Sequence, residues 1–219
     1  MKKGKIILLE GTDGSGKNTQ ARMLVEMLNQ NRIPSVMRNF PRYETPTGKI
    51  IAECYLGKTG NSWFSNPVEL NPKIASLYYA ADRLAAKNLI EEIVSSGTNL
   101  ILDRYVESNM AHQGGKLKGE ERKKFIDFVE KLEYGLLELP RPDRTIFIYV
   151  PTEVTIKLRK QRNEIPDAHE RNFEHLRNAE EAYLELSEKF SWTKIECVQK
   201  GEIRNRESIA EEIYQCLGF

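Results

Sequence analysis

The segment that best predicts the fold of this chain is Gly11-Thr12-Asp13-Gly14-Ser15-Gly16-Lys17. It has the spacing G-x-x-x-x-G-K, follows the apolar run 6–9 and precedes the amphipathic segment 21–28, so a strand, a turn and a helix are expected in that order. In such a loop, backbone N–H groups surround a polyphosphate, while the lysine and the helix N-terminus add positive charge. The segment therefore predicts a nucleoside-triphosphate site, and an incidental glycine-rich turn is the less favoured interpretation.

The residue after this lysine departs from the usual motif. Asn18 stands where Ser or Thr commonly binds Mg²⁺, and Thr19 follows one place later. An asparagine oxygen can still contact the metal or one of its waters, so nucleotide binding is expected, whereas direct metal ligation by Asn18 is left open. The residues predicted to bind ATP share this loop and the first helical turn: Gly11, Thr12, Asp13, Gly14, Ser15, Gly16, Lys17, Asn18 and Thr19.

Length, charge and cysteine content limit the number of domains, the partners and the compartment that we expect for this protein. A chain of 219 residues predicts one domain, and a net charge of +1 from 33 basic and 32 acidic residues gives no overall attraction to nucleic acid or to an anionic membrane. Cys54, Cys197 and Cys216 are widely spaced, as in proteins with reduced thiols. No apolar run reaches bilayer length and no secretory pattern begins the chain, so a soluble, cytoplasmic protein is expected.

Short apolar runs alternate with amphipathic segments along the chain. Strands are predicted at 5–10, 34–39, 99–103, 144–150 and 193–198, and helices at 16–29, 72–96, 118–132, 152–162, 170–190 and 206–217. Several of the apolar runs lack polar alternation, which is typical of parallel strands covered on both faces. The pattern predicts a doubly wound α/β domain whose ligands bind beyond the carboxyl ends of the strands, just after residues 10, 39, 103 and 150.

Three arginines lie where this topology would bring them near the phosphate loop. Arg42 follows the second predicted strand, Arg104 follows the third, and Arg83 lies on a predicted helix one turn after Tyr79. The planar guanidinium donates two parallel hydrogen bonds and keeps its charge, which suits phosphate. For any one arginine a solvated ion pair is the better interpretation. Two at strand ends beside a phosphate loop favour a second, phosphate-bearing substrate.

Several segments together resemble the thymidylate kinase family. They are 10–20 (EGTDGSGKNTQ), 40–42 (FPR), 80–83 (AADR), 103–108 (DRYVES), 167–171 (DAHER) and 181–186 (EAYLEL). The resemblance runs in order from about residue 5 to residue 190 and implies a P-loop NTPase fold. That fold is a three-layer α/β/α domain over 1–219, with a five-stranded parallel sheet and a helical lid at about 159–171.

The resemblance implies an ATP-dependent phosphotransferase that converts dTMP to dTDP in dTTP biosynthesis. ATP and dTMP are then the expected small-molecule partners, Mg²⁺ the expected cofactor, and a homodimer the expected assembly. Another deoxynucleoside or nucleoside-monophosphate kinase of the same fold is the alternative, and the acceptor arginines favour a phosphorylated acceptor over a nucleoside.

On the donor side, the resemblance implies that Lys17 and the loop amides bind the ATP phosphates. Asp13 would contact the 3′-hydroxyl of the deoxyribose or another acceptor-side atom. Asp103 would position Mg²⁺ through water, with Asn18 as a second candidate. Little more is required, because phosphoryl transfer is accelerated mainly by alignment and by neutralising charge on the transferred group.

The charge on the transferred group is assigned to arginines. By resemblance, Arg42, Arg83 and Arg104 hold the acceptor phosphate and the charge that develops during transfer. Some family members also carry an arginine in the phosphate loop where this chain has Gly14. The lid must then supply it, and the candidates are Arg159 and Arg162, one turn apart. A basic, exposed helix face is the competing interpretation.

The remaining acceptor-site predictions concern the base and the sugar. Phe40 belongs to the Phe-Pro element of the acceptor site, Tyr79 matches an aromatic platform for thymine, Ser108 matches a hydroxyl that binds the base edge, and Gln113 helps close the base pocket. Helical spacing alone does not decide whether Tyr79 or its neighbour Tyr78 packs in the core.

His112 stands where the family commonly has Tyr or Phe near the sugar 2′ position. An imidazole is smaller and can form hydrogen bonds, so the strictness for deoxyribose is left open by the sequence. A structural role is the more common one for a single helical histidine.

Overall fold

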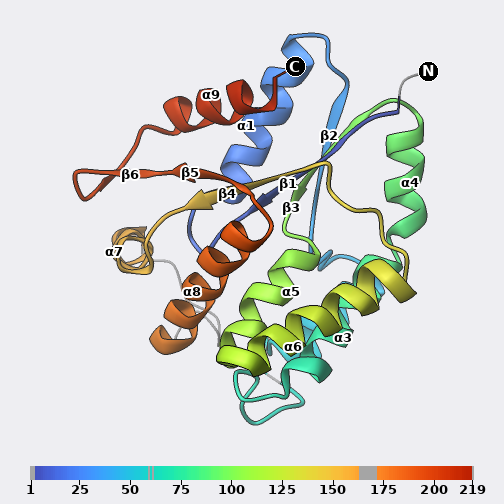
Figure 1. Ribbon diagram of the computed structural model, residues 1–219, viewed down its shortest axis with the longest axis vertical. Helices are drawn as coiled ribbons and strands as arrows, with labels where there is room; N and C mark the ends of the chain where they lie inside the picture. Colours follow the sequence, from blue (N-terminus) through green and yellow to red (C-terminus); the bar gives the residue numbers. More distant parts are fainter. Residues whose placement is uncertain (1–2, 59, 61, 163–171, 219) are drawn as a thin grey trace.

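The computed structural model describes residues 3–58, 60, 62–162 and 172–218 (Figure 1). Its centre is a sheet of five parallel strands in the order β2-β3-β1-β4-β5. The strands are β1 (Ile6–Glu10), β2 (Ser35–Asn39), β3 (Asn99–Asp103), β4 (Arg144–Tyr149) and β5 (Thr193–Glu196). Every residue of β1 and β3 is buried, as their uninterrupted apolar runs predict. The predicted α/β fold with a five-stranded parallel sheet is confirmed.

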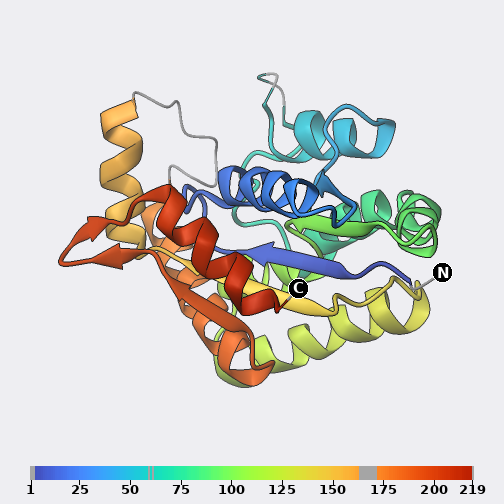
Figure 2. The same ribbon diagram turned by 90° about the horizontal axis from the view of Figure 1, so that it is seen from above.

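Helices cover both faces of this sheet. On one face, α1 (Lys17–Gln30) and α9 (Arg206–Leu217) pack against Ile7 and Leu9 of β1. On the other, Ile6 and Leu8 face α4 (Lys87–Ser95), α5 (Val106–His112), α6 (Gly119–Val129) and α8 (Phe173–Lys189). Figure 2 shows the strands between α1 and α6. Because side chains alternate along a strand, β1 supplies both halves of the core.

The beginnings of several helices follow from their sequences. Asn71 accepts a hydrogen bond from the Lys73 N–H at the start of α3 (Pro72–Leu84), with proline at the first helical position. Asn172 caps α8 and Asn205 caps α9 in the same way. These short polar side chains satisfy N–H groups that have no partner within the helix.

The single helix predicted over 72–96 is wrong, because the chain forms α3 and α4 with a break at Ala85 and Ala86. The Ala86 N–H bonds to the Arg83 carbonyl, a tighter turn than an α-helix makes. The two helices pack against different partners, α3 against α2, the segment Ile50–Tyr55 and α5, and α4 against β3. No glycine or proline marks the break, so tertiary packing determines it.

Some short elements of the structure have no clear signal in the sequence. These are α2 (Pro46–Lys49), the π-helical segment Ile50–Tyr55, α5, and the antiparallel hairpin of β6 (Val198–Gln199) and β7 (Glu202–Ile203). Because the hairpin follows β5 directly, the fifth strand ends at Glu196 and not at 198. Each of these helical segments is too short to show a clear amphipathic period.

The predicted lid falls mostly outside the described residues. The backbone of α7 (Thr152–Arg162) is described to its end, but the side chains of Arg159 and Arg162 and all of 163–171 are not. Among the helices that are described, none is long and apolar enough to cross a bilayer.

Candidate active site

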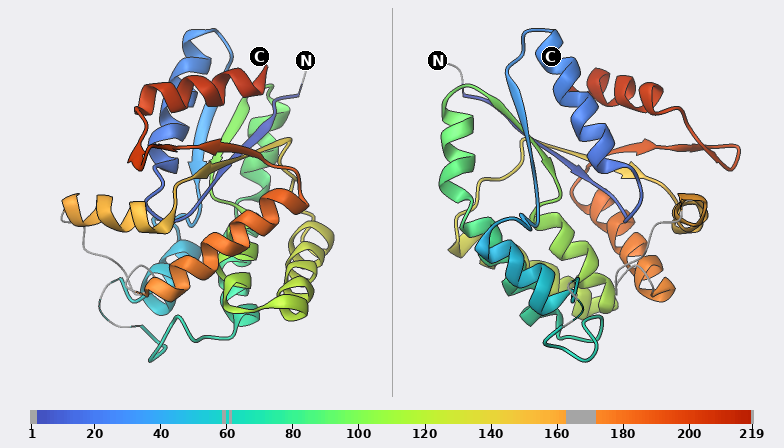
Figure 3. Two further views of the ribbon diagram at one scale, coloured as in Figure 1. Left: turned by 60° about the vertical axis from the view of Figure 1, so that its left-hand side comes forward. Right: turned by 180° about the vertical axis from the view of Figure 1, so that it is seen from behind.

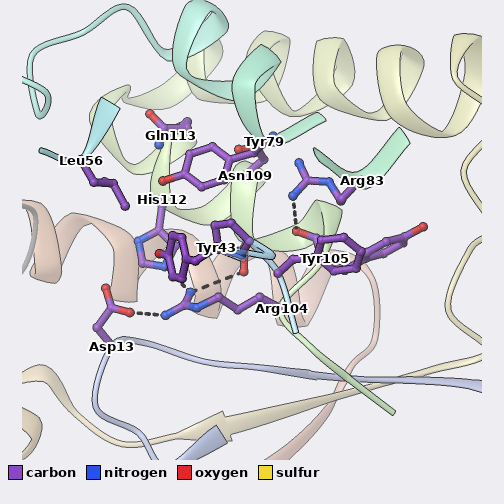
Figure 4. A pocket seen from close by; sticks show the side chains of 13 residues that line it. Asp13, Tyr43, Leu56, Tyr79, Arg83, Arg104, Tyr105, Asn109, His112 and Gln113 are labelled. Atoms are coloured by element: carbon purple, nitrogen blue, oxygen red, sulfur yellow. Dashed lines mark hydrogen bonds and ion pairs between the residues drawn. The ribbon is translucent and has the colours of Figure 1, made fainter. Parts of the chain in front are cut away.

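A pocket opens beyond the carboxyl ends of β1, β2 and β3 (Figure 4). It is lined by Asp13, Phe40, Pro41, Tyr43, Leu56, Tyr79, Arg83, Arg104, Tyr105, Ser108, Asn109, His112 and Gln113. All the residues predicted for the acceptor side are in this lining except Arg42. The structure therefore brings together side chains from four distant segments, while the role of each stays a prediction.

The phosphate loop forms one border of this pocket. A Cβ on Gly11 would lie 2.5 Å from the Ile148 carbonyl oxygen, so only glycine fits there. Gly14 and Gly16 have φ values of 80° and 88°, a conformation that favours glycine. The loop thus takes a path that other residues would strain, and it leads directly into the N-terminus of α1.

Lys17 lies folded against this loop. Its Nζ donates to the Gly11 carbonyl at 2.9 Å and to the Thr12 carbonyl at 2.7 Å, and the residue is 5% exposed. Burial, with a further contribution from Arg104, lowers the pKa of Lys17 to about 8. A bound polyphosphate would favour the ammonium form and give this charge a stronger partner than two carbonyls.

Asp13 and Arg104 join the two sides of the pocket. Arg104 follows β3, has a left-handed φ of 69°, and forms an ion pair with Asp13 of the phosphate loop (Figure 4). Its Nη1 lies 2.9 Å from His112 Nε2. Burial alone would lower the pKa of Arg104, but Asp13 and other acids outweigh burial and raise it, so the guanidinium stays charged.

His112 is buried beside this pair. Burial is the main cause that holds its pKa well below the usual range, Asp13 opposes the shift, and Arg104 and His175 add to it. The ring is therefore neutral near pH 7, and its Nε2 accepts from Arg104. This contact holds the imidazole beside the guanidinium, and its predicted place near the sugar 2′ position stays a prediction.

The Ser108 side chain lines the pocket and contacts Glu10, while its predicted contact with the base edge stays a prediction. Its hydroxyl lies 2.9 and 2.8 Å from the two Glu10 carboxylate oxygens, and Tyr183 Oη also donates to Glu10, at 2.8 Å. The Tyr105 N–H donates to the same carboxylate at 3.0 Å. Burial raises the pKa of Glu10, while Arg104 and these hydroxyls partly offset the rise. In this structure, the Ser108 hydroxyl is therefore part of the hydrogen-bond network around the Glu10 carboxylate.

Each of the three nitrogens of the Arg83 guanidinium donates a hydrogen bond to a neighbouring residue. Its Nε and Nη2 donate to the Glu133 carboxylate at 2.5 and 2.7 Å, and its Nη1 donates to the Tyr105 carbonyl at 3.2 Å. Both charged residues are almost completely buried, and Asn109 also donates to Glu133. The guanidinium lines the pocket but is held by a fully buried carboxylate, whereas the Arg104–Asp13 pair is partly exposed, so we rank Arg104 ahead of Arg83 as a phosphate ligand.

Arg42 is outside the pocket lining. Its side chain forms an ion pair with Asp82 at 3.1 Å and also donates to the Asp82 carbonyl at 2.9 Å. Thr45 and Thr47 donate to the same carboxylate. The sequence placed Arg42 correctly after β2, but had no signal for the buried aspartate that holds it.

The two adjacent tyrosines on α3 both pack against Tyr55, in a small apolar cluster between Ile50–Tyr55 and α3. The Tyr78 ring is stacked on Tyr55 with centroids 6.2 Å apart, and the Tyr79 ring lies edge-on to it at 5.8 Å. Of the two, only Tyr79 also lines the pocket. Gln113 Nε2 lies 3.5 Å from Tyr55 Oη, and its buried Oε1 has no partner among the described residues. The base-platform prediction for Tyr79 fits this placement and stays a prediction.

Asn18 and Asp103 lie together at the loop. Asn18 Nδ2 donates to Asp103 Oδ2 at 3.2 Å, and Asp103 Oδ1 is buried without a partner among the described residues. Among the residues that the structure describes, there is no cluster of three or more His, Cys, Asp or Glu side chains that could hold a metal without other ligands. Carboxylate and amide oxygens suit Mg²⁺, which binds to one or two protein groups plus phosphate and water. The donor set therefore fits Mg²⁺ that arrives with a nucleotide.

Comparison with known proteins gives one consistent result. The family model described as thymidylate kinase matches residues 9–209. The thymidylate kinase of Buchnera aphidicola subsp. Baizongia pistaciae is 31% identical over 188 residues, covering 85% of this chain and 83% of that protein. The thymidylate kinase of Carboxydothermus hydrogenoformans is 34% identical over 191 residues, covering 84% and 85%.

A solved structure is similar over nearly the whole chain. The thymidylate kinase of Candida albicans superposes with a TM-score of 0.76 over 98% of this chain and 91% of that one, at 23% identity. At this identity the likeness shows the fold alone.

Proposed function

The chain belongs to the thymidylate kinase family, and from this membership we propose that it transfers the γ-phosphoryl group of ATP to dTMP, giving ADP and dTDP. The observation that carries the proposal is the contact between Asp13 and Arg104, because it joins a phosphate loop to a pocket for a second substrate. A coupled ADP-release assay across the common nucleoside monophosphates tests it. Highest turnover with dTMP is expected, and preference for another monophosphate would support the alternative kinase.

In this mechanism the chain's own residues align and neutralise the phosphates. Lys17 and the loop N–H groups hold the donor phosphates, and Arg104 neutralises charge between donor and acceptor. The dTMP phosphate oxygen attacks the γ-phosphorus as the bond to the β–γ bridging oxygen breaks, and the electron pair leaves with ADP. No strong base is needed, because the attacking phosphate is already ionised.

We expect Mg²⁺ to be held by Asp103 through water, with Asn18 nearby. When bound, the ion would neutralise charge on the donor phosphates. Asp103 Oδ1 supports this proposal because a buried carboxylate oxygen without a partner is costly unless an ion or water satisfies it.

Substitution of Asn18 is expected to be tolerated. Because Mg²⁺ dehydrates reluctantly, it tends to keep several waters, and the observed amide contact is only one hydrogen bond to Asp103. Asn18→Ser and Asn18→Gly should each retain kcat within about tenfold of the parent enzyme, a change of about 1.4 kcal/mol in the barrier. Steady-state kinetics at several Mg²⁺ concentrations measures this. A collapse of activity in both variants would show that the amide is an essential contact.

The lid stays part of the proposal for the single domain of 1–219. Pro166 disfavours helix at Ile165, which predicts a break between α7 and α8. Closure around the substrates would exclude water, since transfer otherwise competes with hydrolysis. With Gly14 in the phosphate loop, this segment would supply the missing arginine.

Removing the two candidate lid arginines is expected to impair transfer. At least one of Arg159→Ala and Arg162→Ala, and the double variant, should lower kcat by about 10²-fold, because a preorganised positive charge near the transition state is lost. The affinity for dTMP should change little. Pre-steady-state transfer and dTMP binding separate these effects. Normal turnover of the double variant would place both arginines on a solvated surface.

The outer face of α3 supports a homodimer. Ile74, Leu77 and Leu84 form a stripe on this helix and are 46%, 50% and 42% exposed, and Ile50 on the preceding segment is 42% exposed. Figure 3, right, views the molecule from the side on which these helices lie in front. An exposed apolar patch of this kind indicates an interface. A second copy packed against the same stripe would bury it in both subunits.

The dimer prediction is tested with Leu77→Glu. Placing a charge in the centre of the apolar stripe should convert a dimer into a monomer, because the carboxylate would be desolvated at the interface. Sedimentation velocity at several concentrations measures the change. Glu211→Lys on the exposed surface of α9, away from this stripe, is the control and should leave the assembly unchanged. A wild-type monomer at high concentration would contradict the proposal.

The cytoplasmic location stays a prediction from the sequence.

A further inference from the structure

A second cleft lies on the opposite edge of the sheet from the phosphate loop. It has a volume of about 240 Å³ and includes the first residues of β4 and β5, Arg144 and Thr193. The other walls come from α5, from the π-helical segment Glu130–Leu136 and from residues 190–192. None of the residues that line the candidate active site lines this cleft. It is a separate space at the amino ends of the strands.

The cleft contains a carboxylate with an unused oxygen. Glu107 is 7% exposed, and its Oε1 accepts from Tyr134 Oη at 2.6 Å. Its Oε2 is buried and has no partner among the described residues. Buried carboxylate oxygens are nearly always satisfied by a donor. An N–H or O–H donor bound in the cleft would satisfy Glu107 Oε2.

Aromatic rings form the walls around this carboxylate. Phe190 and Trp192 are stacked with centroids 6.3 Å apart and planes 16° apart. Arg141 lies over the Tyr134 ring at 4.1 Å and is bonded to Glu130 at 3.0 Å, so its charge has a partner. These surfaces suit a planar, apolar body, and Lys189 lies over the Phe190 ring at 5.1 Å, as Arg141 does over Tyr134.

The charges that line the cleft also favour a cation. The cleft is lined by the carboxylates of Glu107, Glu130 and Asp143 and by the guanidinium groups of Arg141 and Arg144. The lining therefore has a net charge of −1 when Glu107 is ionised. An ionised Glu107 repels an anion, whereas a cation pairs with it and leaves the Arg141–Glu130 contact in place.

We propose that this cleft is a second ligand site, which binds a planar aromatic cation of the amidine or amine class with one N–H donated to Glu107 Oε2. The ring of the ligand packs against Phe190 and Trp192. The site stands on its own geometry and does not depend on the proposed kinase activity.

The experiment uses benzamidine as the cation and benzamide as its neutral isostere. The chain has two tryptophans, and Trp63 is 73% exposed and far from the cleft lining. In a Trp63→Phe variant, Trp192 is the only tryptophan, so its fluorescence reports the cleft. Benzamidine should give a saturable change, with an affinity about tenfold or more above that of benzamide, because only the cation pairs with the carboxylate.

The pH dependence gives a second readout. Burial is the main cause that raises the pKa of Glu107 to about 7, with the Tyr134 hydroxyl and Arg83 lowering it and Glu10 raising it. The remaining charged groups that face the cleft are Glu130, Asp143, Arg141 and Arg144. A cation binds the ionised carboxylate better, so benzamidine affinity should increase as pH rises through about 7. Benzamide affinity should not increase over the same range.

A substitution completes the test. In the Trp63→Phe background, Glu107→Gln should reduce benzamidine affinity to that of benzamide and remove the pH trend. Glu121→Gln, on the exposed surface of α6, is the matched control and should leave both unchanged. The proposal is overturned by an unsaturable response to benzamidine, by equal affinity for the two ligands, or by benzamidine binding that does not vary with pH. These three readouts use intact Glu107, so they hold even if the Glu107→Gln variant does not fold.

Discussion

Replacing Lys17 by alanine is expected to lower kcat by at least about 10³-fold, with the enzyme still folded. The ammonium group lies at the phosphate loop, where it donates to the carbonyls of Gly11 and Thr12 and, at 3.5 Å, to the Ser15 hydroxyl. In the transition state it would instead neutralise charge on the donor phosphates. The loss should therefore appear in kcat and not only in ATP binding.

Single-turnover transfer and circular dichroism measure the two parts of this prediction. Lys123→Ala is the matched control, since that lysine is exposed on α6 and paired with Glu120. Because ATP favours the charged form of Lys17, ATP affinity of the parent enzyme should fall as pH rises above its pKa of about 8. A folded Lys17→Ala enzyme with near-normal turnover would refute the assignment of the phosphate loop.

The second large effect is expected for Arg104→Ala. Arg104 lies between the phosphate loop and the acceptor pocket, and a charge in that position is worth about 10³-fold or more in phosphoryl transfer. Catalytic efficiency toward dTMP should fall by that order, while the affinity for ATP should change far less. Steady-state kinetics with each substrate varied and direct ATP binding separate these effects. Equal losses for both substrates would place Arg104 on the donor.

Arg83→Ala provides an instructive comparison. It should also weaken use of dTMP more than binding of ATP, but it leaves Glu133 buried without its charged partner. Breaking a buried pair in this way costs about 3–5 kcal/mol. Chemical denaturation should therefore show a large loss of stability for Arg83→Ala and a small one for Arg104→Ala, whose partner Asp13 is partly exposed. Similar losses in the two variants would contradict this distinction.

The sheet was predictable because its strands have a strong local signal. Runs such as 6–9 and 100–102 are apolar without interruption, and the loop after β1 has a spacing tied to one backbone path. The break between α3 and α4 was not predictable, since both sides of it have high helix propensity. The break is determined by the packing of α3 and α4 against different partners, and helix propensity read from the sequence does not contain that information.

The candidate site shows a similar division. Topology alone predicted that residues after β1, β2 and β3 would meet, and they do. The predicted fourth position, after residue 150, contributes nothing to the lining of this pocket. The contacts of Ser108 with Glu10 and of Arg83 with Glu133 depend on buried acids 98 and 50 residues away. No periodic pattern marks such a partner, although the acid at Glu10, inside an apolar strand, was a visible irregularity.

The carboxylate of Glu10 also bears on how the chain acquires its site during synthesis. It binds the Tyr105 N–H, 95 residues away, and the Tyr183 hydroxyl, 173 residues away. Contacts this distant in sequence form late, because a long loop must close before they contribute. A nascent chain that ends before residue 183 can contain the phosphate loop and most of the sheet, yet it lacks a ligand of this buried acid. The network that holds Tyr105 and Ser108 at the pocket is therefore complete only after α8 has left the ribosome, and truncated chains are expected to have a less ordered acceptor site.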